Sequence, residues 1–291
     1  KIKVCLDCGN GVGGVIAPQA FKLLGLEVIE LYSEVNGNFP NHHPDPSNPK
    51  NLKDLQKKVL ETNSDLGIAL DGDGDRVGLI DNKGNIIFPD TYLMLLAEDL
   101  LKKSKGSIVF DVKCSTNLRK VIKNFSGTPV MSRTGHSYIK SKIIETNALL
   151  GGEMSGHIFF NDDWYGFDDA IYSALRMIEV LSKSKLTPHE IFNSYPKHFS
   201  TPEINLKVPE ENKFKVIDEL KTLIDSSVYE LIDIDGIRLE NENSWGLVRA
   251  SNTSPNLVLR FEGKTESDLL EIKNYFKEIL SKIEIDLQLD F

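Results

Sequence analysis

The chain has 291 residues, of which 40% are hydrophobic and 26% charged, a composition typical of a folded globular protein. Its net charge of −9 argues against a general nucleic-acid-binding function, which requires a basic face. No run of 18 apolar residues occurs, so the sequence predicts no membrane-spanning helix and no membrane partner.

Strand and helix patterns alternate through the first two thirds of the sequence, which is typical of α/β units. The first series predicts strand 2–6, helix 15–24, strand 27–31, helix 51–62, strand 66–70 and a hairpin over 77–88. A second series begins with helix 90–103, for which Asp90 is the predicted N-cap. It continues with strand 107–111, helix 115–124, strand 129–131, helix 137–146, strand 149–153 and helix 168–184.

Beyond Tyr195 and Pro196 the pattern changes to strand, helix, several strands and a long helix that begins at Glu266. We therefore predict two consecutive α/β domains with mixed sheets, followed by a smaller α+β C-terminal domain. The predicted domains are residues 1–88, 89–200 and 201–291. Because ligands of α/β domains bind at the carboxyl ends of strands, the motifs that follow the strands are the candidate sites.

The first candidate is an acidic loop, residues 71–76, which follows a short apolar run. Its sequence Asp-Gly-Asp-Gly-Asp-Arg puts three carboxylates at alternate positions, and the glycines let the backbone turn so that they converge. Oxygen ligands that are few in number suit Mg²⁺, and Arg76 next to them would pair with a phosphate. A calcium EF-hand is excluded because Arg76 and Asn82 stand where it needs Gly and Glu. The alternative is a solvated turn.

The second candidate is a glycine loop, residues 9–14, which follows the first predicted strand. It satisfies Gly-x-Gly-x-x-Gly, and Glu30 ends the next strand, so it matches the dinucleotide-binding fingerprint. An NAD-dependent oxidoreductase is therefore an alternative function. The other interpretation is a tight strand-to-helix turn that binds nothing. The acidic loop weighs against the oxidoreductase, because nicotinamide chemistry needs no three converging carboxylates.

Other polar groups follow later strands. Lys113 is a candidate cation, and His136, between a strand and a helix, is a candidate general acid or base. Glu153 and Ser155 have the same strand parity, so both can point at the hydroxyls of one sugar. Residues 249–254 combine a guanidinium, three hydroxyls and an amide, which would form a phosphate cradle. The alternatives are a surface loop for His136 and a polar turn for the cradle.

Several motifs taken together, in this order, resemble the bacterial phosphomannomutase/phosphoglucomutase group of the α-D-phosphohexomutase family. They are residues 36–46, 71–76, 134–137, 152–157, 164–169 and 249–253. The resemblance covers the whole chain. It implies an enzyme that interconverts hexose 6-phosphate and hexose 1-phosphate of mannose or glucose. The implied reaction passes through a hexose 1,6-bisphosphate and a phosphoserine of the enzyme.

The resemblance also implies roles for individual residues. Mg²⁺ would be held by Asp71, Asp73 and Asp75. The catalytic residues would be Arg76, Lys113 and His136. The sugar would be bound by Glu153, Ser155 and His157, and the non-reacting phosphate by Arg249, Ser251, Asn252 and Thr253.

One feature of the family is missing. Its phosphoserine lies in a Thr-Ala-Ser-His-Asn-Pro type loop of the first domain, and this sequence contains no Ser-His-Asn-Pro. We therefore expect a piece of such an enzyme that lacks the N-terminal phosphoserine domain and is inactive alone. Its expected partners are that domain and hexose phosphates; the alternative is a fragment that binds sugar phosphate without turnover. Three cysteines, a sparse and odd set, fit a reducing cytosol, so we expect a cytoplasmic protein.

Overall fold

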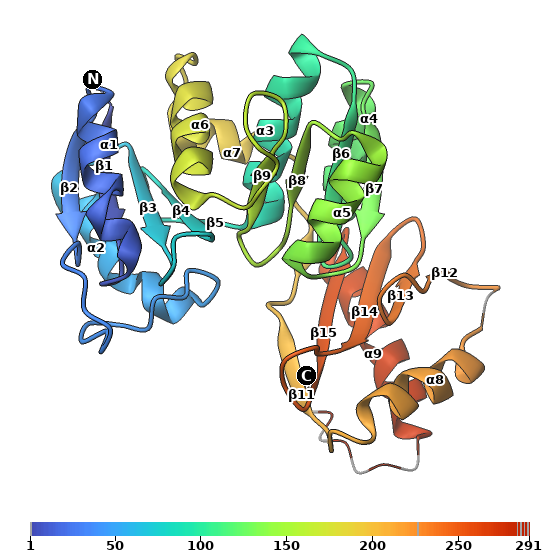
Figure 1. Cartoon of the computed structure of the whole chain (residues 1–291). Helices are drawn as coiled ribbons and strands as arrows, with labels where there is room; N and C mark the ends of the chain where they lie inside the picture. Colours follow the sequence, from blue (N-terminus) through green and yellow to red (C-terminus); the bar gives the residue numbers. More distant parts are fainter. Residues whose placement is uncertain (1, 226, 284, 286, 288, 290) are drawn as a thin grey trace. The chain divides into compact units, whose positions relative to one another are not determined.

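The computed structural model describes residues 2–225, 227–283, 285, 287, 289 and 291 (Figure 1). The chain divides into two compact units, Lys1–Tyr195 and Pro196–Phe291. The division falls where the sequence pattern changes, between Tyr195 and Pro196. None of the helices in the described part of the chain combines the length and apolar character that crossing a membrane requires.

The first unit begins with a mixed sheet in the order β2-β1-β3-β4-β5. Its strands are β1 (Lys3–Asp7), β2 (Glu27–Leu31), β3 (Leu66–Leu70), β4 (Val77–Asp81) and β5 (Ile86–Ile87). Strands β2, β1 and β3 are parallel, whereas β4 and β5 are antiparallel to their neighbours. Every residue of β3 is buried, which explains its continuous apolar sequence in the middle of the sheet.

The helices beside this sheet depart slightly from prediction. The predicted helix 15–24 is a 3₁₀ turn, η1 (Val12–Val15), followed by α1 (Ala17–Leu23). The predicted helix 51–62 likewise begins as a 3₁₀ turn, η2 (Pro49–Leu52), before α2 (Lys53–Thr62). A proline lies at the start of α1 and of η2, where its missing N–H costs nothing.

A second mixed sheet follows in the order β7-β6-β8-β9. Its strands are β6 (Ser107–Asp111), β7 (Thr128–Ser132), β8 (Leu150–Gly152) and β9 (Ile158–Phe160). Only β9 is antiparallel to its neighbour. The helices are α3 (Pro89–Lys103), α4 (Thr116–Asn124), α5 (His136–Thr146), α6 (Ala170–Ser182) and α7 (Pro188–Asn193). The sequence did not predict β9 or α7, which are short elements with weak periodicity.

The predicted N-cap at Asp90 is wrong. Helix α3 begins one residue earlier, with Phe88 as N-cap and Pro89 in its first turn. Asp90 is buried, and its carboxylate accepts a hydrogen bond from the Ser115 backbone N–H at 3.1 Å. The carboxylate therefore joins α3 to the start of α4 instead of capping its own helix.

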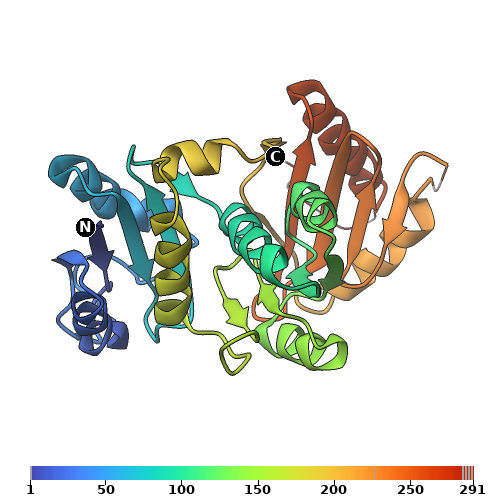
Figure 2. The same ribbon diagram turned by 90° about the horizontal axis from the view of Figure 1, so that it is seen from above.

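The two sheets of the first unit share one hydrophobic core (Figures 1 and 2). Helix α6 packs against β3 and β4 of the first sheet and against β9 of the second. Helix α3 packs against α6 and β8, and its buried Tyr92 donates a hydrogen bond to the Val77 carbonyl of β4. This packing holds the loop after β3 and the turn between β8 and β9 in fixed positions.

The second unit is an antiparallel sheet in the order β10-β15-β14-β13-β12, with β11 also paired to β15. Its elements are β10 (Phe199–Ser200), β11 (Ile204–Lys207), α8 (Lys213–Leu223), β12 (Glu230–Ile232), β13 (Ile237–Glu240), β14 (Ser244–Ala250), β15 (Asn256–Gly263) and α9 (Glu266–Ser281). Apolar residues of β14, β15, α8 and α9 form its core. The predicted fold class, two α/β sheets followed by an α+β part, is confirmed.

Candidate functional site

The acidic loop brings three carboxylates together at the carboxyl end of β3. Asp71, Asp73 and Asp75 each offer an oxygen atom, and these atoms lie within 4.8 Å of one another. Asp71 is fully buried, and its Oδ1 accepts the backbone N–H groups of Gly74, Asp75 and Arg76 at 3.0 Å each. Gly74 has φ +82°, a conformation that permits this tight turn.

Arg76 is bound to carboxylates of its own unit. Its Nε donates to Asp71 Oδ2 at 2.7 Å, and its Nη1 donates to Asp45 Oδ1 at 3.3 Å. Burial raises the pKa of Asp71 to about 6, although the bonds from Arg76 act in the opposite direction. In this structure the guanidinium pairs with carboxylates of and beside the acidic loop, whereas the sequence analysis assigned it to a phosphate. Asp45 lies within residues 36–46, but sequence reasoning gave it no role.

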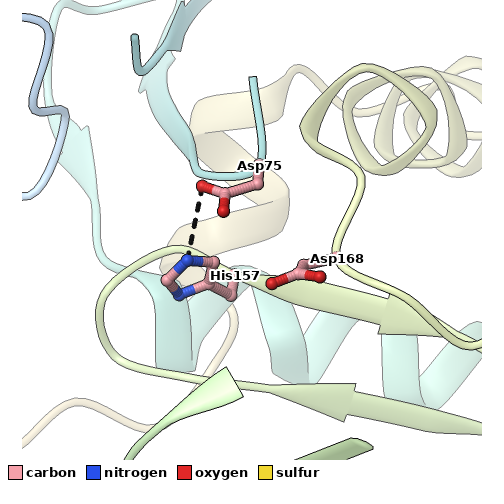
Figure 3. Close-up of side chains that lie close together, drawn as sticks. All are labelled: Asp75, His157 and Asp168. Carbon is pink, nitrogen blue, oxygen red and sulfur yellow. Dashed lines mark ion pairs between the residues drawn. The ribbon is translucent and has the colours of Figure 1, made fainter. Parts of the chain in front are cut away.

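The 153–157 turn joins β8 to β9 and contacts the acidic loop directly. The Val77 N–H donates to the Gly156 carbonyl at 3.1 Å, and Arg76 and His157 form an antiparallel bridge. Gly156 has φ +102°, and a Cβ there would lie 2.9 Å from the Val77 carbonyl oxygen. The His157 Nε2 lies 3.3 Å from Asp75 Oδ1, the ion pair drawn in Figure 3.

Within this turn His157 is surrounded by acceptors. Its Nδ1 lies 3.2 Å from Glu153 Oε2 and 2.8 Å from Ser155 Oγ. Burial disfavours the imidazolium, but the bonds and charges of Asp75 and Glu153 outweigh burial and raise the pKa of His157 to about 9. The bond from His157 in turn lowers the pKa of Asp75 to about 2. A cationic His157 therefore lies between the two carboxylates at neutral pH.

The parity argument for Glu153 and Ser155 is wrong, because β8 ends at Gly152 and both residues belong to the turn. Their side chains nevertheless meet at His157. The buried Glu153 also accepts the Gly135 backbone N–H at 2.6 Å, which ties this turn to the start of α5.

Asp168 is a further carboxylate at this place (Figure 3). It receives a hydrogen bond from Lys140 Nζ at 3.1 Å, and its Oδ2 lies 3.8 Å from His136 Nδ1. Asp75, His157 and Asp168 form a second group close enough to hold a metal ion. The positive charges of His157 and Lys140 already balance this group, however. The oxygen-only acidic loop therefore fits Mg²⁺ better.

Asp168 was part of a quoted motif, residues 164–169, but sequence reasoning gave it no site role. His136 begins α5, and 58% of its side chain is exposed.

Lys113 follows β6 and is buried, with its Nζ 3.8 Å from Asp111 Oδ2. Asp111 also accepts the Thr134 hydroxyl at 3.1 Å and the Met154 N–H at 3.3 Å, so it organises three segments. Sequence reasoning missed Asp111. The signal that identified Asp71, a carboxylate at the end of a buried strand, would have found it.

The phosphate cradle, residues 249–254, belongs to the second unit. Arg249 on β14 is buried, and its Nε donates to Asp235 Oδ2 at 2.8 Å. Ser251 Oγ accepts the N–H groups of Thr253 and Ser254 at 3.3 and 3.2 Å, and the buried Lys213 donates to the Ser251 carbonyl at 2.9 Å.

The side chains of Asn252 and Thr253 are exposed at this turn. Sequence reasoning missed Asp235 and Lys213, because both come from distant segments. Within the second unit, the four predicted phosphate-binding residues thus lie on the end of β14 and the turn that follows it.

The glycine loop contacts the protein's own backbone. A Cβ on Gly11 would lie 2.7 Å from the Gly72 carbonyl oxygen, and a Cβ on Gly14 would lie 2.1 Å from that of Ser33. The Val12 N–H donates to the Gly72 carbonyl at 3.0 Å. Gly11 lets the acidic loop pack closely and Gly14 does the same for the backbone at Ser33, which favours the interpretation as a tight turn over a dinucleotide site.

Fold and site together define an α/β protein whose acidic loop has the ligand pattern of a metal site and lies at the carboxyl end of a strand in one mixed sheet. A histidine-containing turn of the next sheet lies beside this loop. The chain belongs to the phosphoglucomutase/phosphomannomutase family. The models of its alpha/beta/alpha domains II and III match residues 1–84 and 88–199, and the model of its C-terminal domain matches residues 203–279.

Individual relatives agree with this assignment. A phosphomannomutase/phosphoglucomutase of Pseudomonas putida is 53% identical over 100% of this chain and 63% of its own length. A crystal structure of a family protein from Burkholderia thailandensis is 44% identical, with a TM-score of 0.92 over 98% of this chain and 62% of that one.

A more distant structure shares the fold. It is Aspergillus fumigatus N-acetylphosphoglucosamine mutase in complex with GlcNAc-6P and magnesium, with 18% identity and a TM-score of 0.67 over 97% of this chain and 61% of that one. The chain thus spans less than two thirds of the proteins that it resembles.

Proposed function

We propose that this chain supplies the metal, sugar and phosphate sites of a phosphohexomutase. The reaction interconverts hexose 6-phosphate and hexose 1-phosphate of mannose or glucose through a 1,6-bisphosphate. The convergence of Asp71, Asp73 and Asp75 within 4.8 Å is the observation that carries this proposal. Three predicted domains divide the work: residues 1–88 hold the metal, 89–200 recognise the sugar, and 201–291 bind phosphate.

Asp71, Asp73 and Asp75 would hold Mg²⁺, which an A. fumigatus relative carries in its complex. Magnesium, when bound, reduces the negative charge on the oxygens of a transferring phosphoryl group. Arg76 orients Asp71 through Nε and keeps the carboxylates together in the absence of metal. Lys113, buried at the end of β6, is the proposed second cation near that phosphoryl group.

The sugar would be held by the 153–157 turn. Glu153 accepts hydroxyl protons, Ser155 donates or accepts, and the cationic His157 donates. Their mutual hydrogen bonds fix these side chains before a hexose arrives, which lowers the entropy cost of binding. His136, exposed at the start of α5, is the proposed general acid or base for the reacting hydroxyl.

The cradle of the second unit would hold the phosphate that does not react. Asp235 orients Arg249, and the exposed Asn252 and Thr253 add donors around it. Such a site binds the phosphate dianion and makes no contact with the sugar ring, so it can accept either phosphate group of a hexose bisphosphate. Arg249→Ala should weaken binding of glucose 1-phosphate and glucose 6-phosphate alike, by about one to two orders of magnitude. Loss of only one of the two affinities would contradict this role.

The phosphoserine of the reaction would come from the family's domain I, so we propose that these 291 residues alone bind substrate without turnover. The partners are then that domain and hexose phosphates. We also propose a cytoplasmic location, since three cysteines are a sparse and odd set that fits a reducing compartment.

Magnesium titration of the 291-residue chain by calorimetry tests the proposal. Asp73→Asn should lower the Mg²⁺ affinity about tenfold or more, because one of three anionic ligands loses its charge. Asp163→Asn, an exposed aspartate in the loop before α6, is the matched control and should leave the affinity unchanged. Equal affinities of Asp73→Asn and the unaltered chain would overturn the metal site.

A further inference from the structure

The sequence contains the pair asparagine-glycine twice, as Asn10-Gly11 and as Asn36-Gly37. In such a pair the backbone nitrogen that follows the asparagine is unhindered, because glycine carries no Cβ. That nitrogen can form a bond to the Cγ of the asparagine side chain and release the side-chain amide as ammonia. Whether a folded protein permits this reaction depends on how firmly it holds the side chain and the nitrogen, and the two pairs differ in both respects.

The fold locks the Asn10-Gly11 pair. Asn10 is only 6% exposed, its Nδ2 donates to the Glu34 carbonyl at 2.7 Å, and its Oδ1 accepts Asn41 Nδ2 at 2.8 Å. The Gly11 N–H donates to the Cys8 carbonyl at 2.8 Å. The Asn10 Cγ therefore cannot turn toward the Gly11 nitrogen without breaking these hydrogen bonds, and buried polar groups that lose their partners are costly.

The Asn36-Gly37 pair is open. Gly37 and Asn38 are exposed, and a Cβ on Gly37 would meet no atom within 4 Å. Within the part of the chain that the structure describes, neither the Gly37 N–H nor the Asn36 Nδ2 donates a hydrogen bond. The Asn36 Oδ1 accepts the Asn38 backbone N–H at 3.0 Å, and such a donor stabilises the negative charge that develops on this oxygen when Cγ is attacked.

We propose that Asn36 is a site of spontaneous deamidation, at which the folded chain produces aspartate and isoaspartate, whereas Asn10 stays intact. The Gly37 nitrogen loses its proton and forms a bond to the Asn36 Cγ, the bond from Cγ to Nδ2 breaks, and the amide leaves as ammonia with that proton. One water molecule then opens the cyclic imide at either of its two carbonyl groups. Opening at the backbone carbonyl gives isoaspartate, in which the chain continues through the side chain.

The modification alters a turn outside the metal, sugar and phosphate roles proposed above. The Asn36 N–H donates to the Asn10 carbonyl at 3.0 Å, and the Asn36 carbonyl accepts the Phe39 N–H at 2.9 Å. Isoaspartate lengthens the backbone by one carbon and turns the Asn36 carbonyl into a free carboxylate. The bond that closes the turn over residues 36–39 is then lost, and the chain gains a negative charge there.

Peptide mapping by mass spectrometry, with an isoaspartate methyltransferase as the probe, tests the site in the purified 291-residue chain during prolonged incubation at mildly alkaline pH. In the folded chain, isoaspartate should form at residue 36 at least about tenfold faster than at residue 10. In urea the two pairs should react at similar rates, because only the fold distinguishes them. Gly37→Ala, for which the structure leaves room, should slow the reaction at residue 36 about tenfold, because the added Cβ hinders the nitrogen.

Equal rates at the two residues in the folded chain, or a faster reaction at residue 10, would overturn the proposal. So would an Asn36 that stays intact in the folded chain while it reacts in urea, because the turn would then protect it. An unchanged rate in Gly37→Ala would show that the glycine nitrogen is not the attacking group and would overturn the proposal as well.

Discussion

The glycine loop and the acidic loop follow two neighbouring parallel strands, β1 and β3, and both are rich in glycine, yet their glycines serve different ends. In the glycine loop, residues 9–14, they make room for another segment of backbone. In the acidic loop, residues 71–76, Gly74 allows a turn that gathers charges around Asp71. The first loop is held by close packing and the second by hydrogen bonds and ion pairs, so an abundance of glycine indicates neither the function of a loop nor the force that stabilises it.

The largest effect on the free energy of unfolding is expected from a substitution that disturbs the packing of the glycine loop. Gly11→Ala places a Cβ 2.7 Å from the Gly72 carbonyl oxygen and 2.8 Å from that of Asp71, and neither backbone atom can move freely. We expect the free energy of unfolding, measured with urea, to fall by about 2–4 kcal/mol. Gly37→Ala, where a Cβ would meet nothing within 4 Å, should change it by less than about 0.5 kcal/mol. Similar values for the two variants would refute the close-packing explanation.

In the acidic loop, electrostatic interactions should contribute most of the stability. Arg76→Gln removes the cation bound to the buried Asp71, and the free energy of unfolding should fall by about 1–3 kcal/mol. Because the loss is electrostatic, added Mg²⁺ should restore part of it, whereas Gly11→Ala should gain no extra stability from the ion. The melting temperature of each variant is measured with and without Mg²⁺. If Mg²⁺ raised the melting temperatures of Arg76→Gln and Gly11→Ala equally, the two loops would not differ in the force that stabilises them.

A pH dependence should arise where the glycine loop meets the loop of residues 36–46. Asp7 accepts the Gly9 N–H through Oδ1 and pairs with His42 Nε2 through Oδ2, and the bond from Asp7 raises the pKa of His42 to about 9. A raised folded-state pKa stabilises the fold fully below the unfolded value of about 6.5, and this contribution disappears as the pH rises through about 9.

The contribution of this pair to the free energy of unfolding should therefore fall by about 2 kcal/mol between pH 6.5 and 9.5. In His42→Gln that part of the slope should vanish. An unchanged pH profile in the variant would show that His42 is not the titrating group.

The smallest effect concerns the dinucleotide alternative. The carbonyl groups of Gly72 and Ser33 lie against the glycines that would approach a pyrophosphate. Millimolar NAD⁺ should therefore leave the melting temperature of the chain unchanged, whereas Mg²⁺ should raise it. Saturable NAD⁺ binding in a calorimetric titration would revive the alternative that the fingerprint suggested.

Apolar runs in the sequence predict several of the strands with their correct boundaries. The predicted ranges 66–70 and 107–111 coincide with β3 and β6, because burial on both faces leaves a continuous apolar signal. The predicted range 27–31 coincides with β2, an edge strand that keeps the exposed Glu27 and Glu30. Helix starts were less certain: Asp90 looked like an N-cap, but a long-range bond to Ser115 decided its place. Local sequence contains no record of such distant partners.

In the candidate site, too, some features could be predicted from the sequence and others could not. The acidic loop could be recognised because its ligands are adjacent in sequence, and the roles assigned to its residues stay predictions. The roles of Asp45 and Asp235 as orienting partners could not be predicted, because both act on residues that only the fold brings near. The strand-parity argument for Glu153 failed because β8 stops one residue earlier.

The backbone bond between Val77 and Gly156, with the bridge from Arg76 to His157, also limits how such a protein can change during evolution. Inserting or deleting one residue in the acidic loop or in the 153–157 turn would shift the pairing and separate Asp75 from His157. We therefore expect a change in the length of one segment to require a compensating change in the other. In the proposed function, a change of sugar preference would have to come from exchanging side chains within a turn of fixed length.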